Sequence, residues 1–214
     1  MLTKEQNKIL KTIFNSELKD FAAWGGGTAL AEEYLHHRTS DDIDIILTDL
    51  PPTFTLTSVA NKVKKALSAK KMKSFVKMNR FQYFYEADDG QNQKLEFVYY
   101  PFIKLEKPKR KGPVVIESLR DIAASKTLAG YQRNEPKDAF DLYVILTRKI
   151  FSLSQLITDV EKKFGEEIDA IMLLSHLTKS AEQFDELRPL ILEKACQKDL
   201  INLFQKEFNK IQKN

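Results

Sequence analysis

The chain has 214 residues, 43% of them hydrophobic and 30% charged, which is the balance of an ordinary globular protein with a sizeable core. Its net charge of +4 permits a nucleic-acid partner without requiring one, and its single cysteine excludes a disulfide framework. The N-terminus lacks the apolar run of a signal peptide and no stretch is long enough to span a membrane, so we expect a cytoplasmic protein.

The first elements lead into a run of glycines. Apolar residues at helical spacing predict a helix over Thr3–Leu18, and Phe21–Trp24 is a short apolar run typical of a strand. The glycine-rich turn Gly25–Thr28 follows, and Ala29–Leu35 continues as a helix. Glycines before a helix let backbone N–H groups approach a phosphate at the positive end of the helix dipole. This turn is therefore a candidate phosphate cradle.

A strand with two acidic residues comes next. Asp42 and Asp44 alternate with isoleucines, so both carboxylates lie on one face of the strand. Two adjacent carboxylates are costly unless a cation neutralises them, and carboxylate oxygens suit Mg²⁺. A phosphate cradle beside metal-binding acids is suited to a nucleoside triphosphate.

The middle of the chain predicts more strands. After a proline break at Leu50–Pro52 and a surface helix marked by Val59 to Leu67, two aromatic and β-branched runs, Phe75–Glu86 and Lys94–Tyr100, flank Asp88–Gly90 like the arms of a hairpin. The basic connection Lys104–Gly112 is typical of a solvated loop, with contact to a nucleic-acid backbone as the alternative. Val114–Ile116 predicts a last short strand.

From residue 117 onward the pattern is helical, so we place a domain boundary there: 1–116 is predicted to be an α/β domain and 117–214 an α-helical one. The predicted helices are Leu119–Tyr131, Pro136–Leu146, Ser154–Phe164, Glu166–Leu177, Phe184–Cys196 and Leu200–Ile211. Lys126 and Arg133 are two helical turns apart, and Asp138 and Asp141 share a helix face. Alone, these acids are more typical of the first turns of a helix, or of a surface ion pair, than of a functional site.

The string GGTAL…HRTSDDIDI, followed downstream by a lysine helix, an arginine and Lys-Asp-x-x-Asp, resembles the AbiEii family of toxin nucleotidyltransferases within the DNA polymerase β-like superfamily. The resemblance covers roughly residues 20–146. It implies a small mixed sheet flanked by helices, followed by a helical domain, with the active site between them. It also implies a third carboxylate on a neighbouring strand, for which Glu96 is the candidate, Glu86 is a weaker rival, and a solvent-facing edge-strand glutamate is the alternative.

The resemblance further implies residue roles. Lys126 would contact the triphosphate, and Asp138 or Asp141 would activate or orient the acceptor. The expected metal ligands are Asp42, Asp44 and Glu96; the expected catalytic residues are these three with Lys126, Asp138 and Asp141; and the expected nucleotide-binding residues are Gly26, Gly27, Thr28, Arg38, Ser40, Lys126, Arg133 and Lys137. For Arg38 and Ser40, a capped turn explains the residues equally well.

The function implied is transfer of a nucleotidyl group from a nucleoside triphosphate to an acceptor, with Mg²⁺ or Mn²⁺ as the metal. RNA, such as the acceptor end of tRNA, is the favoured acceptor, and an antitoxin is a possible partner. The alternatives are a protein or small-molecule acceptor, or a non-catalytic module that binds nucleotide or RNA.

Overall fold

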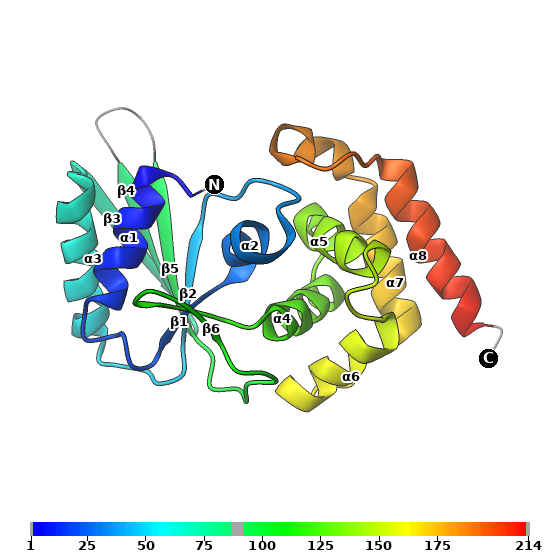
Figure 1. The fold of residues 1–214 in the computed structure, drawn as a ribbon, viewed down its shortest axis with the longest axis horizontal. Coiled ribbons are helices and arrows are strands. Elements are labelled where there is room, and N and C mark those ends of the chain that lie inside the picture. Colours follow the sequence, from blue (N-terminus) through cyan, green and yellow to red (C-terminus); the bar gives the residue numbers. More distant parts are fainter. Residues whose placement is uncertain (1, 87–91, 213–214) are drawn as a thin grey trace. The chain divides into compact units, whose positions relative to one another are not determined.

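The computed structural model describes residues 2–86 and 92–212, so the turn predicted at Asp88–Gly90 lies outside the described residues. The chain divides into two compact units (Figure 1). The first comprises Met1–Phe102 and Lys107–Ser118, and the second comprises Ile103–Glu106 and Leu119–Asn214. The sequence placed a boundary at 117, but it gave no sign that the short segment Ile103–Glu106 belongs with the helical unit.

The first unit is built on a mixed sheet. Seven strands are present among the described residues: β1 (Ala22–Gly25), β2 (Ile43–Leu47), β3 (Lys71–Lys77), β4 (Arg80–Glu86), β5 (Gln93–Tyr99), β6 (Lys109–Lys111) and β7 (Val114–Ile116). Their order is β3-β4-β5-β2-β1-β7-β6. The β2–β5 and β1–β7 pairs are parallel, and the other neighbours are antiparallel. This sheet with flanking helices confirms the predicted fold class.

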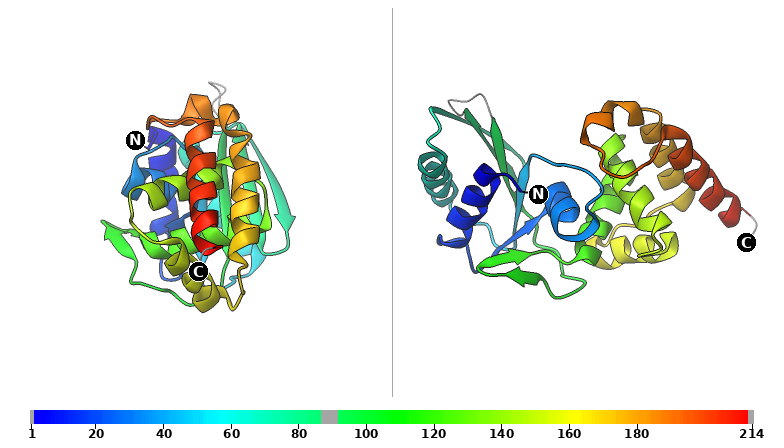
Figure 2. Two further views of the ribbon diagram at one scale, coloured as in Figure 1. Left: turned by 90° about the vertical axis from the view of Figure 1, so that its right-hand side faces the viewer. Right: turned by 45° about the horizontal axis from the view of Figure 1, so that its top comes forward.

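Helices α1 (Lys4–Phe14) and α3 (Thr53–Leu67) cover one face of this sheet (Figures 1 and 2). On that face the Tyr85 hydroxyl of β4 donates to the Ala60 carbonyl of α3 at 3.2 Å. Because strand side chains alternate, β4 buries every second residue against α3 and turns the others to the opposite face. Helix α2 (Gly26–Leu30) and the π-helical segment η1 (Ala31–Leu35) connect β1 to β2.

Two segments of the first unit differ from the sequence prediction. The stretch Phe75–Glu86 was predicted as one strand, but β3 and β4 form a hairpin around Met78 and Asn79. The turn contains no glycine or proline. Met78 adopts a left-handed backbone with φ 54°, a conformation that a methionine in the sequence does not predict. Strand β6 lies within the basic segment that was predicted to be a loop, where it pairs with β7.

The second unit is helical. Its helices are α4 (Leu119–Gln132), α5 (Pro136–Thr147), α6 (Leu153–Phe164), α7 (Ala170–Ala181), the 3₁₀ segment η2 (Phe184–Leu190) and α8 (Gln197–Ile211). Helices α7 and α8 lie side by side (Figure 2). The helix predicted over Phe184–Cys196 is wrong, because Pro189 lies inside it and the chain becomes extended at Ile191. Across the described part of the chain, no helix has the length and hydrophobicity needed to cross a membrane.

Candidate active site

The acidic residues of the first unit meet on adjacent strands. Asp42 lies directly before β2, Asp44 lies within it, and Glu96 of β5 is the registered partner of Asp44. Partners in a parallel pair present their side chains on the same face. Since β5 is an interior strand and the Glu96 side chain is only 3% exposed, the alternative of a solvent-facing edge glutamate is wrong.

Two cations accompany these acids. The Lys94 ammonium lies 2.7 Å from Asp42 Oδ2 and 3.7 Å from Glu96 Oε2. The Arg80 guanidinium of β4 lies 2.7 Å from Glu96 Oε1. Burial alone would lower the pKa of Lys94, but its hydrogen bond to Asp42 and the charges of Asp42, Glu96 and Asp44 raise the pKa above its ordinary value. Lys94 is therefore protonated at neutral pH and offsets part of the carboxylate repulsion.

The glycine turn packs directly against the second acid. Gly26 has φ +69°, and a Cβ added to it would lie 2.0 Å from Asp44 Oδ2. That backbone conformation is strained for other residues, and the space is already filled by the carboxylate. Position 26 therefore requires glycine, both for its backbone angle and for its close approach to Asp44. This approach brings the start of α2 against the acidic strand.

Thr28 and Ser40 tie this turn to the start of β2. The buried Thr28 hydroxyl donates to the Asp42 carbonyl and shares a hydrogen bond of 2.8 Å with Ser40 Oγ. Arg38 is also buried, and its Nη1 donates to the Thr39 carbonyl at 3.0 Å. These contacts give Thr28, Arg38 and Ser40 roles in holding the loop; their predicted contacts with nucleotide stay predictions.

The donor set suits a hard divalent cation. Asp42, Asp44 and Glu96 offer only carboxylate oxygens, which Mg²⁺ prefers. Within residues 2–86 and 92–212, however, no three His, Cys, Asp or Glu side chains form a ready-made metal cage. Asp42 and Glu96 have lysine and arginine as neighbours instead. A metal bound to these acids would neutralise the negative charge that Lys94 now neutralises in part.

Glu86 is poorly placed as the third carboxylate. It ends β4 and lies 3.3 Å from Lys73 and 3.8 Å from Lys71, both on β3. Strand β5 separates β4 from β2, whereas Glu96 is directly beside Asp44. The strand register favours Glu96 over its rival.

In the second unit, the predicted downstream residues form one buried ion cluster. The Lys126 ammonium of α4 lies 2.7 Å from Asp138 Oδ1 and 2.8 Å from Asp141 Oδ2, both on α5. Arg133 follows α4 and donates to Asp138 Oδ2 at 2.8 Å. Both aspartate side chains are at most 1% exposed, so the alternative of a surface ion pair is wrong.

The charges in this cluster hold Asp138 ionised. Burial alone would raise its pKa, but the charges and hydrogen bonds of Lys126 and Arg133 outweigh it and lower the pKa below the ordinary value. Lys137, predicted to join this group in nucleotide binding, is exposed on α5. The structure thus brings together Lys126, Arg133, Asp138 and Asp141 within the second unit.

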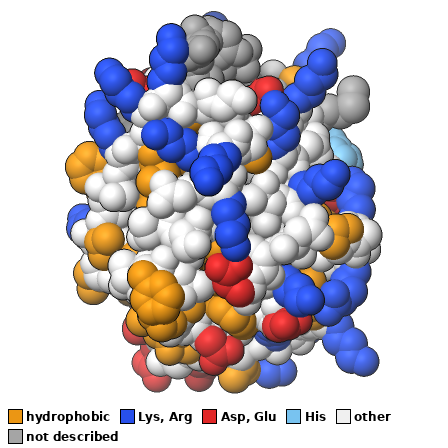
Figure 3. Space-filling model, turned by 90° about the vertical axis from the view of Figure 1, so that its left-hand side faces the viewer, with side chains coloured by type: hydrophobic (Ala, Val, Ile, Leu, Met, Phe, Trp, Pro, Cys, Tyr) orange, Lys and Arg blue, Asp and Glu red, His pale blue; other side chains and the backbone are white. Residues whose placement is uncertain are grey.

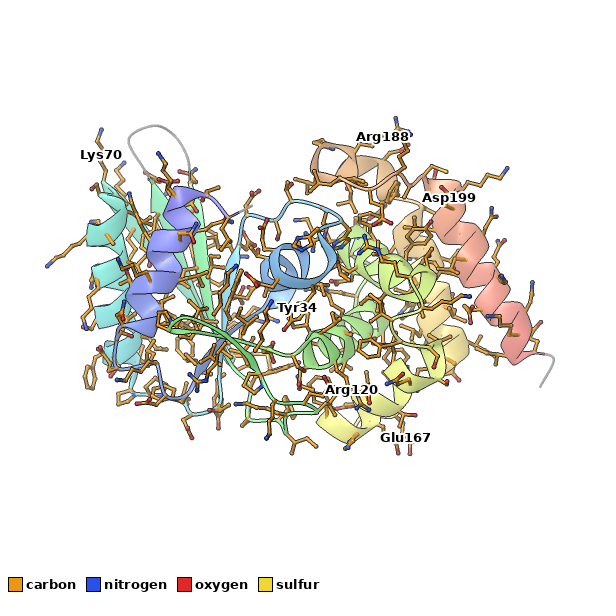
Figure 4. All side chains as sticks on the ribbon, in the orientation of Figure 1. Tyr34, Lys70, Arg120, Glu167, Arg188 and Asp199 are labelled. Atoms are coloured by element: carbon orange, nitrogen blue, oxygen red, sulfur yellow. The ribbon has the colours of Figure 1, made fainter. Side chains whose placement is uncertain are left out.

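The same unit contains a second set of buried ion pairs. Arg120 donates to both Asp159 oxygens at 2.6 and 2.7 Å, and Lys163 lies 2.9 Å from Asp121 (Figure 4 labels Arg120). None of these four was a candidate site residue. Buried ion pairs therefore also serve the fold here, and burial alone does not assign a role in catalysis.

The sequence reasoning missed Lys94 and Arg80. Lys94 precedes Glu96 by two residues, so the alternation of strand side chains places it on the same face. That signal was present in the sequence. Arg80 reaches Glu96 only because β3 and β4 turn at Met78 and Asn79, and this turn was not recognised.

Comparison with known proteins identifies the family of the chain. Residues 8–214 match the family model described as nucleotidyl transferase AbiEii toxin, type IV toxin–antitoxin system. An uncharacterized protein of Aquifex aeolicus is 28% identical over 199 residues, covering 90% of this chain and 87% of the relative.

Solved structures share the fold. JHP933 from Helicobacter pylori superposes with a TM-score of 0.58 at 18% identity, covering 98% of this chain and 91% of its own. MenT4, a nucleotidyltransferase toxin of Mycobacterium tuberculosis, gives a TM-score of 0.57 at 11% identity, covering 93% of this chain and 80% of its own. With the family model matching nearly the whole length, the chain belongs to the AbiEii family of nucleotidyl transferase toxins.

Proposed function

We propose that this protein transfers a nucleotidyl group from a nucleoside triphosphate to a hydroxyl of an RNA acceptor, using Mg²⁺ or Mn²⁺. The observation that carries the proposal is the pairing of Asp44 with Glu96 in register, beside Asp42 and against the Gly26 turn. Family membership supplies the reaction class. The metal, the triphosphate and the RNA acceptor are the parts that we propose.

In the proposed reaction, the acceptor oxygen forms a bond to the α-phosphorus, and the bond to the bridging oxygen breaks. Pyrophosphate leaves with that oxygen, and a carboxylate of the site takes up the hydroxyl proton. Asp42 and Asp44 would hold the metal, which when bound neutralises charge on the attacking and leaving oxygens. Gly26 brings the helix start close to Asp44, and Thr28 fixes the Asp42 backbone.

Glu96 has a distinct proposed role. Arg80 and Lys94 hold both of its oxygens, so its position is set before any ligand arrives. We propose that it completes the acidic face on the side of the acceptor. The substitution Glu96→Gln should then reduce the rate of transfer more than the affinity for the triphosphate.

The type IV toxin–antitoxin description of the family also supports a partner. We propose that an antitoxin limits the effect of this transferase in the cell. Growth arrest on expression of the chain, abolished by Asp44→Asn, would connect such toxicity with the proposed reaction.

The test is a labelling screen. The protein is incubated with each α-³²P-labelled nucleoside triphosphate, Mg²⁺ or Mn²⁺, and total RNA, with protein and small-molecule fractions as alternative acceptors. The proposal expects label in RNA from one or more triphosphates. Label in protein or a small molecule would overturn the RNA acceptor, and no label in any fraction would favour a non-catalytic binding module.

A further inference from the structure

The acidic face of the sheet continues into a basic and aromatic surface. The strand register shows which side chains lie on the face of the sheet away from α1 and α3. On that face, Glu96 is paired with Gln82, Lys94 with Phe84, and Phe84 with Lys73. We call the surface formed by β3 and β4 on this face the open-face patch. Its members are Lys71, Lys73, Phe75 and Lys77 of β3 and Arg80, Gln82, Phe84 and Glu86 of β4.

This patch lies close to the acids within the same unit. Strand β3 is separated from β2 by β4 and β5, and neighbouring strands are about 4.8 Å apart, so the two lie roughly 14 Å apart across the sheet. A few nucleotides of single-stranded RNA span such a distance. An RNA lying across the patch would therefore have an end within reach of Asp44.

The charge of the patch suits a polyanion. Lys71, Lys73 and Lys77 supply three positive charges against Glu86 alone within the patch, while the Arg80 guanidinium is paired with Glu96 at 2.7 Å. The two ion pairs of Glu86, with Lys73 at 3.3 Å and Lys71 at 3.8 Å, involve lysine side chains that are at least 65% exposed. Exposed pairs of this kind are weak, so phosphate groups can replace Glu86 as partners.

The aromatic residues suit unpaired bases. Phe75 is 58% exposed, and its ring meets Phe84 edge to face at 5.7 Å between centroids. Lysines alone on an edge strand are explained by protection against strand-to-strand aggregation. An exposed phenylalanine works against that protection. Basic groups interleaved with accessible aromatic rings are, in contrast, the arrangement that binds single-stranded nucleic acid by stacking.

The α3 side of the first unit provides a contrast. Figure 3 faces that side and shows lysine and arginine side chains spread across it. Phe54 of α3 is 76% exposed, but it lies on the face of the sheet opposite the acids. It is a matched control for Phe75, since both are exposed phenylalanines of the same unit.

We propose that the open-face patch binds the single-stranded end of the RNA acceptor and leads its terminal hydroxyl toward Asp42 and Asp44. The proposal rests on the proposed function for the identity of the acceptor. Phe75 and Phe84 stack on bases, while Lys71, Lys73 and Lys77 contact phosphates. Duplex RNA, whose bases are stacked on each other, gains nothing from these rings.

The test measures RNA binding without triphosphate or metal, by fluorescence anisotropy of a labelled single-stranded oligoribonucleotide and of a duplex of equal length. Phe75→Leu should weaken single-strand binding about 5- to 100-fold, the range for loss of one stacked base. Phe54→Leu should change it less than twofold. Lys73→Gln should lower the salt slope of log K by about 0.7, as for one lost phosphate contact, and Lys65→Gln on α3 should leave it unchanged.

The outcomes separate the two proposals. Three results would overturn the open-face patch, even if RNA is labelled in the transfer screen. The first is that Phe75→Leu and Lys73→Gln both bind single-stranded RNA as the wild type does. The others are that Phe54→Leu weakens binding as much as Phe75→Leu, or that the protein prefers the duplex. Conversely, single-strand binding that depends on Phe75, in a protein that labels nothing, would uphold the patch and overturn the proposed transfer. Circular dichroism of each variant confirms that the fold is retained.

Discussion

The Lys94 ammonium lies 2.7 Å from Asp42 Oδ2, so a lysine of β5 already neutralises an acid proposed to bind metal. The side chains of Lys94 and Asp42 are 25% and 46% exposed, and an ion pair that solvent partly reaches is worth about 1 kcal/mol. A metal must compete with Lys94 for this carboxylate. Lys94→Met should therefore tighten Mn²⁺ binding by about three- to fivefold, measured by calorimetric titration.

The same variant should be less stable without metal, since Asp42, Asp44 and Glu96 lose a shared counter-charge. Added Mn²⁺ should restore more thermal stability to Lys94→Met than to the wild-type protein. Lys65→Met on α3 is the control and should match the wild type in both measurements. Weaker Mn²⁺ binding by Lys94→Met would show that the lysine supports the metal site.

Gly26 and Gly165 form a matched pair for testing the glycine turn. Both have φ +69°, but a Cβ at Gly26 meets Asp44 whereas one at Gly165 has nothing within 4 Å. Gly165→Ala should cost about 1 kcal/mol of unfolding free energy, from backbone strain alone. Gly26→Ala should cost more and should also reduce transfer, because the Asp44 carboxylate must move. Equal costs in urea denaturation would show that the contact with Asp44 is easily relieved.

Lys126 supports the second unit through charge. Removing it leaves Asp138 and Asp141 buried without their shared lysine, and breaking a buried pair in this way costs about 3–5 kcal/mol. Lys126→Met should show that loss in chemical denaturation, while Lys137→Met, at an exposed position of α5, should stay within about 0.5 kcal/mol of wild type. Unchanged stability in Lys126→Met would leave its role to be sought in substrate binding.

The lowered pKa of Asp138 predicts a pH dependence of stability. The pKa of Asp138 is lower in the folded protein than in the unfolded chain, so its carboxylate stabilises the folded state. This contribution is complete at any pH above the pKa of Asp138 in the unfolded chain. The contribution is lost as pH falls through the lower, folded pKa. Asp138→Asn should therefore flatten the decline of thermal stability in strongly acid solution, and an identical decline in both proteins would rule out this linkage.

The sequence predicted the parts of the site that depend on local patterns. Alternation along a strand put Asp42 and Asp44 together, and the same rule gave Glu96 its face. The position of Glu96 beside Asp44 depended on the parallel pairing of β2 with β5, which no local pattern contains. The open-face patch was missed for a similar reason, because the turn at Met78 and Asn79 has no glycine, the residue that most often marks a two-residue hairpin.

The sequence also could not predict which charged residues far apart in the chain form ion pairs. Helical spacing placed Asp138 and Asp141 on one face, but whether they were solvated or buried depended on how α4 packs against α5. The structure shows both acids turned toward Lys126. The same applies to Lys163 and Asp121, 42 residues apart, whose pairing no sequence pattern indicated.

The most direct test of the proposed function compares Asp44→Asn with Asp49→Asn in transfer of label from the active triphosphate to RNA. Asp44 lies in β2 against Gly26 and beside Glu96, whereas Asp49 is exposed just after the strand. Both changes remove one carboxylate without altering size, so only the position differs. We predict that Asp44→Asn abolishes labelling, with its fold intact by circular dichroism, and that Asp49→Asn labels RNA at the wild-type rate. Near-wild-type labelling by Asp44→Asn would contradict the proposal that this acid holds the catalytic metal.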